Sequence, residues 1–281
     1  MLSTRHGVRT LGADDLSDFL ALADEDPVVN VFADYRARTT QLLPRWLGGE
    51  VWGRYSDGKL VAACHAGANL VPVQCSTEDA EAFAERALHR RRSITTIVGP
   101  QEPVQAFWDR VGDDWGTPRE FRVGQPHLEL AGPPLVEPDP AVRLTRRADL
   151  DALYPACVAM YTEEVGISPE CGGGADLYRA RISQLISRGW SFARFEHGRV
   201  VFKAEVACSS PHAAQIQGVY VVPDRRGHGL ATAGMAAVVE QVRASIAPTV
   251  SLYVNDWNVA ARRAYERVGF TETARFTTIM F

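Results

Sequence analysis

A run of prolines near the middle of the chain limits its fold more than any other segment. Four prolines fall within 133–140, in the run Gly132-Pro133-Pro134-Leu135-Val136-Glu137-Pro138-Asp139-Pro140. Because proline has no backbone N–H and a fixed φ, this run can sustain neither a helix nor a central strand. We therefore predict a Pro-rich linker over 132–141 that divides the 281 residues into domains at 1–131 and 142–281.

The two halves carry the same order of predicted elements. Apolar periodicity and turn residues in the first half predict a helix at 14–22, strands at 50–55, 60–66 and 69–75, a helix from Thr77 to 89, a strand at 94–98 and a helix from 103 to Gly112. In the second half they predict helices at 149–162 and 175–187, strands at 191–196, 199–208 and 214–222, a helix at 229–246, a strand at 249–254, a helix at 259–268 and a strand at 276–281. This order predicts an α+β (mixed α/β) fold with two copies of one domain, each a mostly antiparallel twisted sheet flanked by helices.

Composition and charge argue against several classes of partner. The 30 Lys and Arg against 34 Asp and Glu give a formal net charge of −4, so no basic excess favours a nucleic acid or an anionic membrane. No apolar run approaches the ~20 residues of a membrane span. Residues 1–15 lack the apolar core of a signal peptide. We therefore expect a cytoplasmic protein.

The cysteines and histidines show no metal or disulfide pattern. The cysteines are odd in number and contain no CxxC pair: Cys64, Cys75, Cys157, Cys171 and Cys208. We interpret them as small buried hydrophobic side chains in a reducing compartment. Because His65, His127 and His212 have no metal-ligand spacing, we expect no metal site.

The segment 218–232 carries the clearest ligand motif. An apolar strand runs into Pro223, and Arg226-Gly227-His228-Gly229 then opens a helix. Glycines allow a ligand to approach the backbone, and the free N–H groups at a helix N-terminus favour an anion such as pyrophosphate. The segment is neither a Walker loop nor a GxGxxG fingerprint. The structural alternative is a glycine turn before an ordinary surface helix.

Two motifs in the second half resemble the GNAT superfamily of N-acetyltransferases. Arg226-Gly227-His228-Gly229-Leu230-Ala231 is similar to the signature (Gln/Arg)-x-x-Gly-x-(Gly/Ala), and the strand before it looks like the splayed strand of that family. The later run from Asn255 to Phe270 looks like its second motif. Clear resemblance covers 199–281, and 142–198 fit by element order. The paired halves resemble tandem-GNAT proteins in which one half is degenerate.

The resemblance implies a CoA site and its residues. The strand residues Val219, Tyr220 and Val221 correspond to the backbone that pairs with the pantetheine arm, with the Val221 N–H as a candidate donor to the thioester oxygen. The amides that hold the pyrophosphate correspond to Arg226, Gly227, His228, Gly229, Leu230, Ala231 and Thr232. Asn258 matches a residue that contacts the cofactor arm, and Tyr265 matches the acid for the leaving thiolate. The alternatives are an exposed loop position for His228, a helix cap for Asn258 and core packing for Tyr265.

The general base is open at this point. Many relatives carry a carboxylate or histidine on the splayed strand, where this chain has Gln215 and Gln217. Glu205, on the neighbouring strand, is the leading substitute, and its alternative is a charge on the solvent face of the sheet. A bound water and the C-terminal carboxylate remain further candidates. Glu163 and Glu164 match the helix end that contacts substrate, where they would bind a cationic amine or form a solvated terminus.

These residues predict an acetyl-CoA-dependent N-acetyltransferase. We expect transfer from acetyl-CoA, or another acyl-CoA, to a primary amine of a small molecule or peptide, by direct attack in a ternary complex of a monomer or homodimer. One alternative is a CoA-binding regulatory or sensor module that has lost its base, and another is an unrelated phosphate-binding α/β protein. The first half has no phosphate loop, so we expect it to bind no second CoA and to cover the splayed sheet or shape the acceptor pocket.

Overall fold

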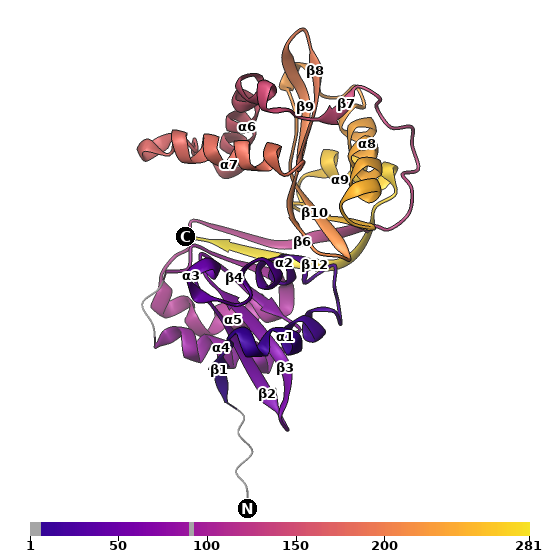
Figure 1. The fold of residues 1–281 in the computed structure, drawn as a ribbon. Coiled ribbons are helices and arrows are strands. Elements are labelled where there is room, and N and C mark those ends of the chain that lie inside the picture. Colours follow the sequence, from indigo (N-terminus) through magenta and orange to yellow (C-terminus); the bar gives the residue numbers. More distant parts are fainter. Residues whose placement is uncertain (1–6, 90–92) are drawn as a thin grey trace, which may run out of the picture. The chain divides into compact units, whose positions relative to one another are not determined.

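The computed structural model describes residues 7–89 and 93–281, which form two compact units (Figure 1). The first unit comprises the described residues up to Leu128 together with Tyr253–Trp257 and Glu272–Phe281. The second comprises Glu129–Leu252 and Asn258–Thr271. The two units therefore interleave along the chain, and the domain boundary at 132–141 stays a prediction.

The first unit is a seven-strand region of sheet with helices on both faces. Its strands follow the order β1-β2-β3-β4-β5-β12-β6, in which β4 and β5 are parallel. The strands are β1 (Val8–Thr10), β2 (Glu50–Ser56), β3 (Lys59–Ala66), β4 (Asn69–Val73), β5 (Thr96–Pro100), β6 (Glu120–Leu130) and β12 (Thr271–Met280). The helices are α1 (Leu16–Ala23), α2 (Val31–Thr40), α3 (Pro44–Leu47), α4 (Thr77–Leu88) and α5 (Gln101–Trp115).

Successive side chains of a strand contribute to hydrophobic cores on opposite faces of the sheet in this unit. Ala63 packs with Phe19 of α1, whereas the neighbouring residues Ala62 and Cys64 pack with Phe83 of α4. Successive side chains of a strand point to opposite faces, so one apolar strand supplies two hydrophobic layers.

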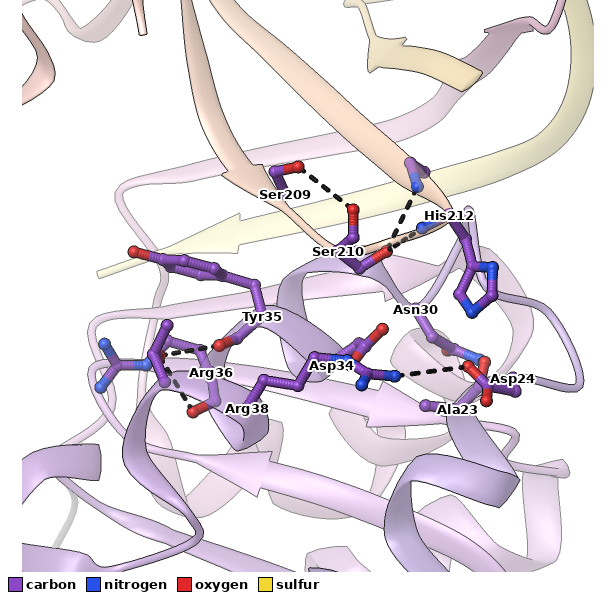
Figure 2. A network of polar contacts seen from close by, with 12 residues as sticks. Ala23, Asp24, Asn30, Asp34, Tyr35, Arg36, Arg38, Ser209, Ser210 and His212 are labelled. Carbon is purple, nitrogen blue, oxygen red and sulfur yellow. Dashed lines mark hydrogen bonds and ion pairs between the residues drawn. The ribbon is translucent and has the colours of Figure 1, made fainter. Parts of the chain in front are cut away.

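Polar contacts join α1 to α2 in the first unit (Figure 2). The amide of Asn30 donates to the Ala23 carbonyl over 3.2 Å, which ties the end of α1 to the start of α2. Arg38 forms an ion pair with the fully buried Asp34 at 2.5 Å and a longer one with Asp24 at 3.8 Å. Burying a carboxylate is costly unless it is paired, so the ion pair with Arg38 compensates for the burial of Asp34.

The second unit repeats the arrangement. Its strands follow the order β11-β10-β9-β8-β7, with β10 and β11 parallel and the other pairs antiparallel. The strands are β7 (Val142–Leu144), β8 (Ser191–Glu196), β9 (Arg199–Ser209), β10 (Ala213–Val221) and β11 (Thr249–Tyr253). The helices are α6 (Leu150–Val165), α7 (Ala175–Ser187), α8 (Leu230–Ser245) and α9 (Val259–Val268). Leu153 of α6 and Ile182 of α7 pack with Val201 and Tyr220 of the sheet.

Several predicted helix ends are wrong by a few residues. The cap of α4 is Ser76 and not Thr77, because the Ser76 hydroxyl accepts from the Asp79 amide over 3.2 Å. Gly112 does not end α5, which continues to Trp115. The helix predicted to end at residue 162 continues to Val165 in α6, which contains Pro155 in its interior.

The strand β6 follows no prediction from the sequence. It spans eleven residues and contains Gly124, at φ +68°, and Pro126. Both residues usually mark the end of a strand, so local sequence patterning argues against it. Its place beside β12 in the sheet stabilises it instead, and Gln125 Oε1 accepts from the Thr278 hydroxyl of β12 over 2.6 Å.

The proline-rich segment is held against the second unit. No helix or strand forms over 131–141, as predicted. The Leu135 amide donates to the Val268 carbonyl over 2.8 Å, and Asp139 forms an ion pair with Arg194 at 2.7 Å. Its backbone is therefore irregular but anchored.

Close packing of α8 on β9 makes Gly234 sensitive to substitution. A Cβ at Gly234 would lie 2.7 Å from Cζ of Phe202, whose side chain is fully buried. We therefore expect Gly234→Ala to lower the free energy of unfolding by about 1–3 kcal/mol through overpacking. Thermal and urea denaturation would measure this change. Adding Phe202→Leu makes room for the methyl group, so the double variant should be less destabilised than the sum of the two single variants. Additive destabilisation would contradict this account.

Candidate functional site: a splayed strand and a glycine loop

Strand β10 separates from its parallel neighbour after the third of its nine residues. It pairs with β11 at Ala213, Ala214 and Gln215, and beyond Gln215 the described strands form no further β10–β11 pair. On the other side, the register with β9 shifts between Gln215 and Ile216 and again between Gln217 and Tyr220. Gly218 lies in the second irregularity at φ +60°, a conformation that other residues rarely adopt. The strand thus diverges from β11 where the sequence predicts a splay.

A tight turn fixes the start of β10. The Ser210 hydroxyl accepts from the amides of His212 and Ala213, each over 3.2 Å (Figure 2). The Ser210 amide donates to the Ala213 carbonyl over 2.8 Å. This turn returns the chain directly from β9 into β10, so the two strands are locked together before the splay begins.

The loop after β10 leads into the N-terminus of α8. Gly227 and Gly229 have φ values of +79° and +77°, and a Cβ at either position would meet nothing within 4 Å. Gly229 is the N-cap of α8, and the amide that bonds to its carbonyl over 3.1 Å is that of Ala233. The amides of the first helical turn precede Ala233 and have no intrahelical acceptor. This exposed helix N-terminus, without an acidic side chain in its first turn, can bind an anion.

Arg226 connects this loop to α6 and to β10. Its Nη2 forms an ion pair with Glu163 at 2.7 Å, and its Nε donates to the Val221 carbonyl over 2.9 Å. The guanidinium also lies over the Tyr220 ring, 5.5 Å from the centroid. The hydrogen bond to Glu163 raises the pKa of Arg226, so this side chain carries a positive charge at the rim of the loop.

The other charged residues of the loop are bound to the neighbouring hairpin. Arg225 donates to Glu196 over 3.0 Å, and Asp224 forms an ion pair with Arg199 at 2.7 Å. His228 is exposed, as its loop position predicts. Of the charged residues in this loop, Arg226 is the one whose guanidinium contacts β10, the strand that the sequence predicts to bind the cofactor.

Tyr265 is buried in α9 and packs against Phe270. The two ring centroids are 6.0 Å apart with the planes inclined by 64°, and Tyr265 is 6% exposed. Burial, and then the negative charge of Glu164, raise the pKa of Tyr265 well above its usual value. The hydroxyl is therefore fully protonated at neutral pH and can donate a hydrogen bond.

Asn258 occupies the helix-cap position that the sequence allowed as an alternative. Its Oδ1 accepts from the Ala261 amide over 3.2 Å at the N-terminus of α9. The cap fixes the start of the helix that carries Tyr265. Gly269, at φ +111°, follows the last residue of that helix, so both ends of α9 are defined.

Glu205 is buried inside the sheet and does not lie on a solvent face. Its Oε2 is 3.0 Å from Nζ of Lys203, and its Oε1 accepts from the Gln217 amide over 2.9 Å. The Lys203 side chain is fully buried. Burial lowers the pKa of Lys203, but the charge and hydrogen bond of Glu205, together with smaller electrostatic contributions from α6, outweigh this effect, so the pKa is raised and the lysine is charged. Sequence reasoning did not single out Lys203, although a lysine between Phe202 and Ala204 in an apolar strand was a signal.

Helix α6 brings Glu163 and Glu164 to this region from its last turn. Gly166 ends the helix in the left-handed conformation, and its amide donates to the Thr162 carbonyl over 2.9 Å. Glu163 pairs with Arg226, whereas Glu164 acts on Tyr265 through its charge. The two carboxylates therefore face different parts of the site.

The corresponding helix of the first unit has a closed N-terminus. Ser76 and Asp79 cap α4 reciprocally, since the Ser76 amide donates to the Asp79 carboxylate over 2.9 Å. Glu78 also lies in the first turn, where negative charge opposes a phosphate. A cavity of about 430 Å³ lies where β4 and β5 end, lined by Gln74, Cys75, Gln101, Glu102 and Arg275 among others. Its loop offers no glycine turn, and the absence of a second CoA site stays a prediction.

The described residues offer no metal centre and no membrane span. Within 7–89 and 93–281, no group of three His, Cys, Asp or Glu side chains is arranged to hold a metal ion. Among the helices of these same ranges, none is both long enough and apolar enough to cross a bilayer.

Comparison with known proteins identifies the domain that contains this site. Residues 189–270 match the model described as the acetyltransferase (GNAT) family, and residues 49–153 match a domain of unknown function, DUF4081. The segment from β8 to α9 is therefore a GNAT acetyltransferase domain, which confirms the resemblance. Mycothiol acetyltransferases from two strains of Mycobacterium leprae are 39% identical over 72 residues, which cover 24% of this chain and 23% of theirs.

Solved structures share the fold over nearly the whole chain. A GNAT-family acetyltransferase from Colwellia psychrerythraea has a TM-score of 0.60 at 16% identity and covers 98% of this chain and 99% of its own. A tandem GNAT protein from the clavulanic acid biosynthesis pathway has a TM-score of 0.54 at 17% identity, over 96% and 97% of the two chains. The predicted mixed α/β fold with two GNAT-like domains is confirmed.

Proposed function

We propose that this protein is an acetyl-CoA-dependent N-acetyltransferase that acts on a primary amine by direct attack in a ternary complex. One observation carries the proposal: the diverging part of β10 ends at an open glycine loop on the N-terminus of α8. This arrangement lies inside the segment that matches the acetyltransferase family. A strand with free backbone beside an anion-binding helix end fits a cofactor with an amide-containing arm and a diphosphate.

The cofactor is proposed to follow β10 into this loop. The backbone of Val219, Tyr220 and Val221 pairs with the pantetheine arm, and the loop amides from Arg226 to Thr232 bind the diphosphate. Arg226 now donates to the Val221 carbonyl, and this group can turn to a phosphate oxygen when CoA binds. The capping role of Asn258 uses Oδ1, which leaves its Nδ2 group for the cofactor arm.

The proposed chemistry is transfer of an acyl group from sulfur to nitrogen. The neutral amine attacks the thioester carbonyl, a C–N bond forms, and the C–S bond then breaks with the electron pair leaving on sulfur. The amine loses one proton to a base or water, and the thiolate gains a hydrogen bond from Tyr265. Because burial raises the pKa of Tyr265, full proton transfer from it is uphill, and hydrogen-bond donation is its more effective role.

The acceptor is proposed to approach past the end of α6. Glu163 and Glu164 supply negative charge there, which attracts a cationic amine before it loses its proton. The substrate class stays at a primary amine of a small molecule or peptide.

One CoA is expected to bind per chain. Calorimetric titration with acetyl-CoA should give a stoichiometry of one, since only α8 among the two corresponding helices presents an open N-terminus. Acetyl-CoA should also raise the Tm, while ATP and NAD at the same concentration should not. Two bound CoA molecules would overturn the assignment of the first unit, and equal stabilisation by ATP would contradict CoA recognition.

The second candidate is a CoA-binding sensor without turnover. It is favoured by Gln217, which stands on the splayed strand in place of a base and donates its amide to Glu205. Thiol release from acetyl-CoA across a panel of primary amines separates the two functions. Turnover above the rate of hydrolysis supports the transferase, whereas tight CoA binding without turnover on any amine supports the sensor.

A further inference from the structure

A buried ion pair lies in β9, next to the irregular part of β10. Lys203 and Glu205 are two residues apart and therefore share one face of the strand, with Nζ and Oε2 3.0 Å apart. Their side chains are 0% and 8% exposed. Removing two charges from water is costly, so a pair in this position needs compensating contacts. Gln217 provides one, because its amide donates to the second oxygen of Glu205 over 2.9 Å.

Gly218 places the backbone of β10 on this ion pair. A Cβ at Gly218 would lie 3.0 Å from Nζ of Lys203 and 3.2 Å from Cδ of Glu205. The same position would lie 3.1 Å from Cε of Met160 in α6. The two charged side chains thus fill the space where the strand bulges away from its regular register. The residues that follow are the ones proposed to pair with the cofactor arm.

The surrounding elements contribute further charge and polar groups. Glu164 of α6 acts on Lys203 through its charge, and Glu205 acts on Tyr178 of α7. Burial raises the pKa of the Cys157 thiol to about 11, so this group is neutral. Lys203 is therefore the cation that balances Glu205 in this part of the core.

We propose that Lys203 and Glu205 are positioning residues, which together hold the bulge of β10 at Gly218 in the shape that receives CoA. The effect of this pair on catalysis rests on the proposed function. Both oxygens of Glu205 accept hydrogen bonds inside the protein, and one donor is a charged lysine. Because both oxygens are engaged by donors of the protein, Glu205 supports the strand and does not take the proton of the amine.

The test compares single and double replacements in the full chain. Lys203→Met leaves a buried carboxylate without its cation, and Glu205→Gln leaves a buried ammonium without its anion. Each single variant should raise the Kd for CoA about 10-fold or more, because an unpaired buried charge draws in water and disturbs the bulge. The double variant is neutral and similar in volume, so its Kd and kcat should return to within about fivefold of wild type.

Other outcomes would overturn the inference. A double variant that binds CoA normally but turns over as slowly as Glu205→Gln would make Glu205 the base. Single variants with normal CoA affinity would show that the pair has no positioning role. If wild type lacks turnover, the proposed function fails, yet the Kd measurements still test the support of the bulge.

Two further variants keep the test informative if a single replacement does not fold. Gly218→Ala forces a methyl group towards the pair and should weaken CoA binding with both charges intact. Asp149→Asn breaks an ion pair with Arg143 (2.7 Å) in the same unit. It should lower the Tm without changing the Kd for CoA. An equal change of Kd in Asp149→Asn would mean that general destabilisation explains the effect.

Discussion

Replacing Tyr265 by phenylalanine is expected to lower kcat for thiol release from acetyl-CoA about 100-fold, since removal of a well-placed hydrogen-bond donor or acid costs on the order of 10²–10⁴ in rate. The ring should keep its packing against Phe270, because the variant loses only the hydroxyl. The Kd for CoA should stay within about threefold of wild type, since the proposed interaction develops as the sulfur leaves. Rates with a saturating amine and calorimetric CoA binding measure the two quantities.

Tyr178→Phe is the matched control for this prediction. Tyr178 is another tyrosine of the second unit, and its hydroxyl donates to the Cys157 carbonyl over 3.0 Å in a partly buried position beside the core. Its loss should cost about 1 kcal/mol of stability with little change of kcat. Equal loss of kcat in both variants would show that Tyr265 acts through packing. Full activity of Tyr265→Phe would mean that water, and not Tyr265, stabilises the leaving thiolate.

Replacing Gly229 by aspartate is expected to weaken CoA binding by about 100-fold, equivalent to about 2.7 kcal/mol of binding free energy. Aspartate tolerates positive φ better than most residues, so the backbone strain is small. A Cβ at this position meets nothing within 4 Å, and the added carboxylate would lie at the N-terminus of α8. Repulsion between it and the diphosphate causes the loss. Titration calorimetry in buffers of low and high salt would measure the change and its screening.

Gly189→Asp is the control for strain and charge. Gly189 has φ +69°, also has open space around it, and lies between α7 and β8. This variant adds the same charge at the same backbone conformation and should bind CoA like wild type. Equal weakening in both variants would mean that net charge or stability accounts for the effect. If Gly229→Asp binds CoA as tightly as wild type, the diphosphate does not bind at this loop.

The local parts of the site could be predicted from the sequence because local chemistry determines them. A proline after an apolar strand, followed by Gly227 and Gly229, defines the loop without knowledge of its neighbours. The cap at Asn258 follows in the same way. The fold class was predictable because the order of helices and strands recurs in both halves.

The partners of the charged residues could not be predicted, because they depend on register between strands. Gln217 looked like a missing base, and its amide in fact donates to Glu205 on β9. That contact requires the shift of β10 against β9, which no local pattern specifies. The pairing of Glu163 with Arg226 joins residues 63 positions apart.

The interleaving of the two units also depends on tertiary contacts. Glu272–Phe281 follows the second motif in sequence but belongs by its contacts to the first unit, where β12 pairs with β5. The strand β6 was missed because Gly124 and Pro126 conceal it. In both cases a distant partner strand determines what the segment forms.

The most direct test of the central claim is a crystal structure of the full chain with CoA bound. The account predicts diphosphate oxygens within hydrogen-bonding distance of the amides between Gly227 and Thr232. It also predicts a pantetheine arm paired with Val219–Val221 and a sulfur within reach of the Tyr265 hydroxyl. CoA bound to the first unit, or bound to the second unit without contact to the N-terminus of α8, would contradict it.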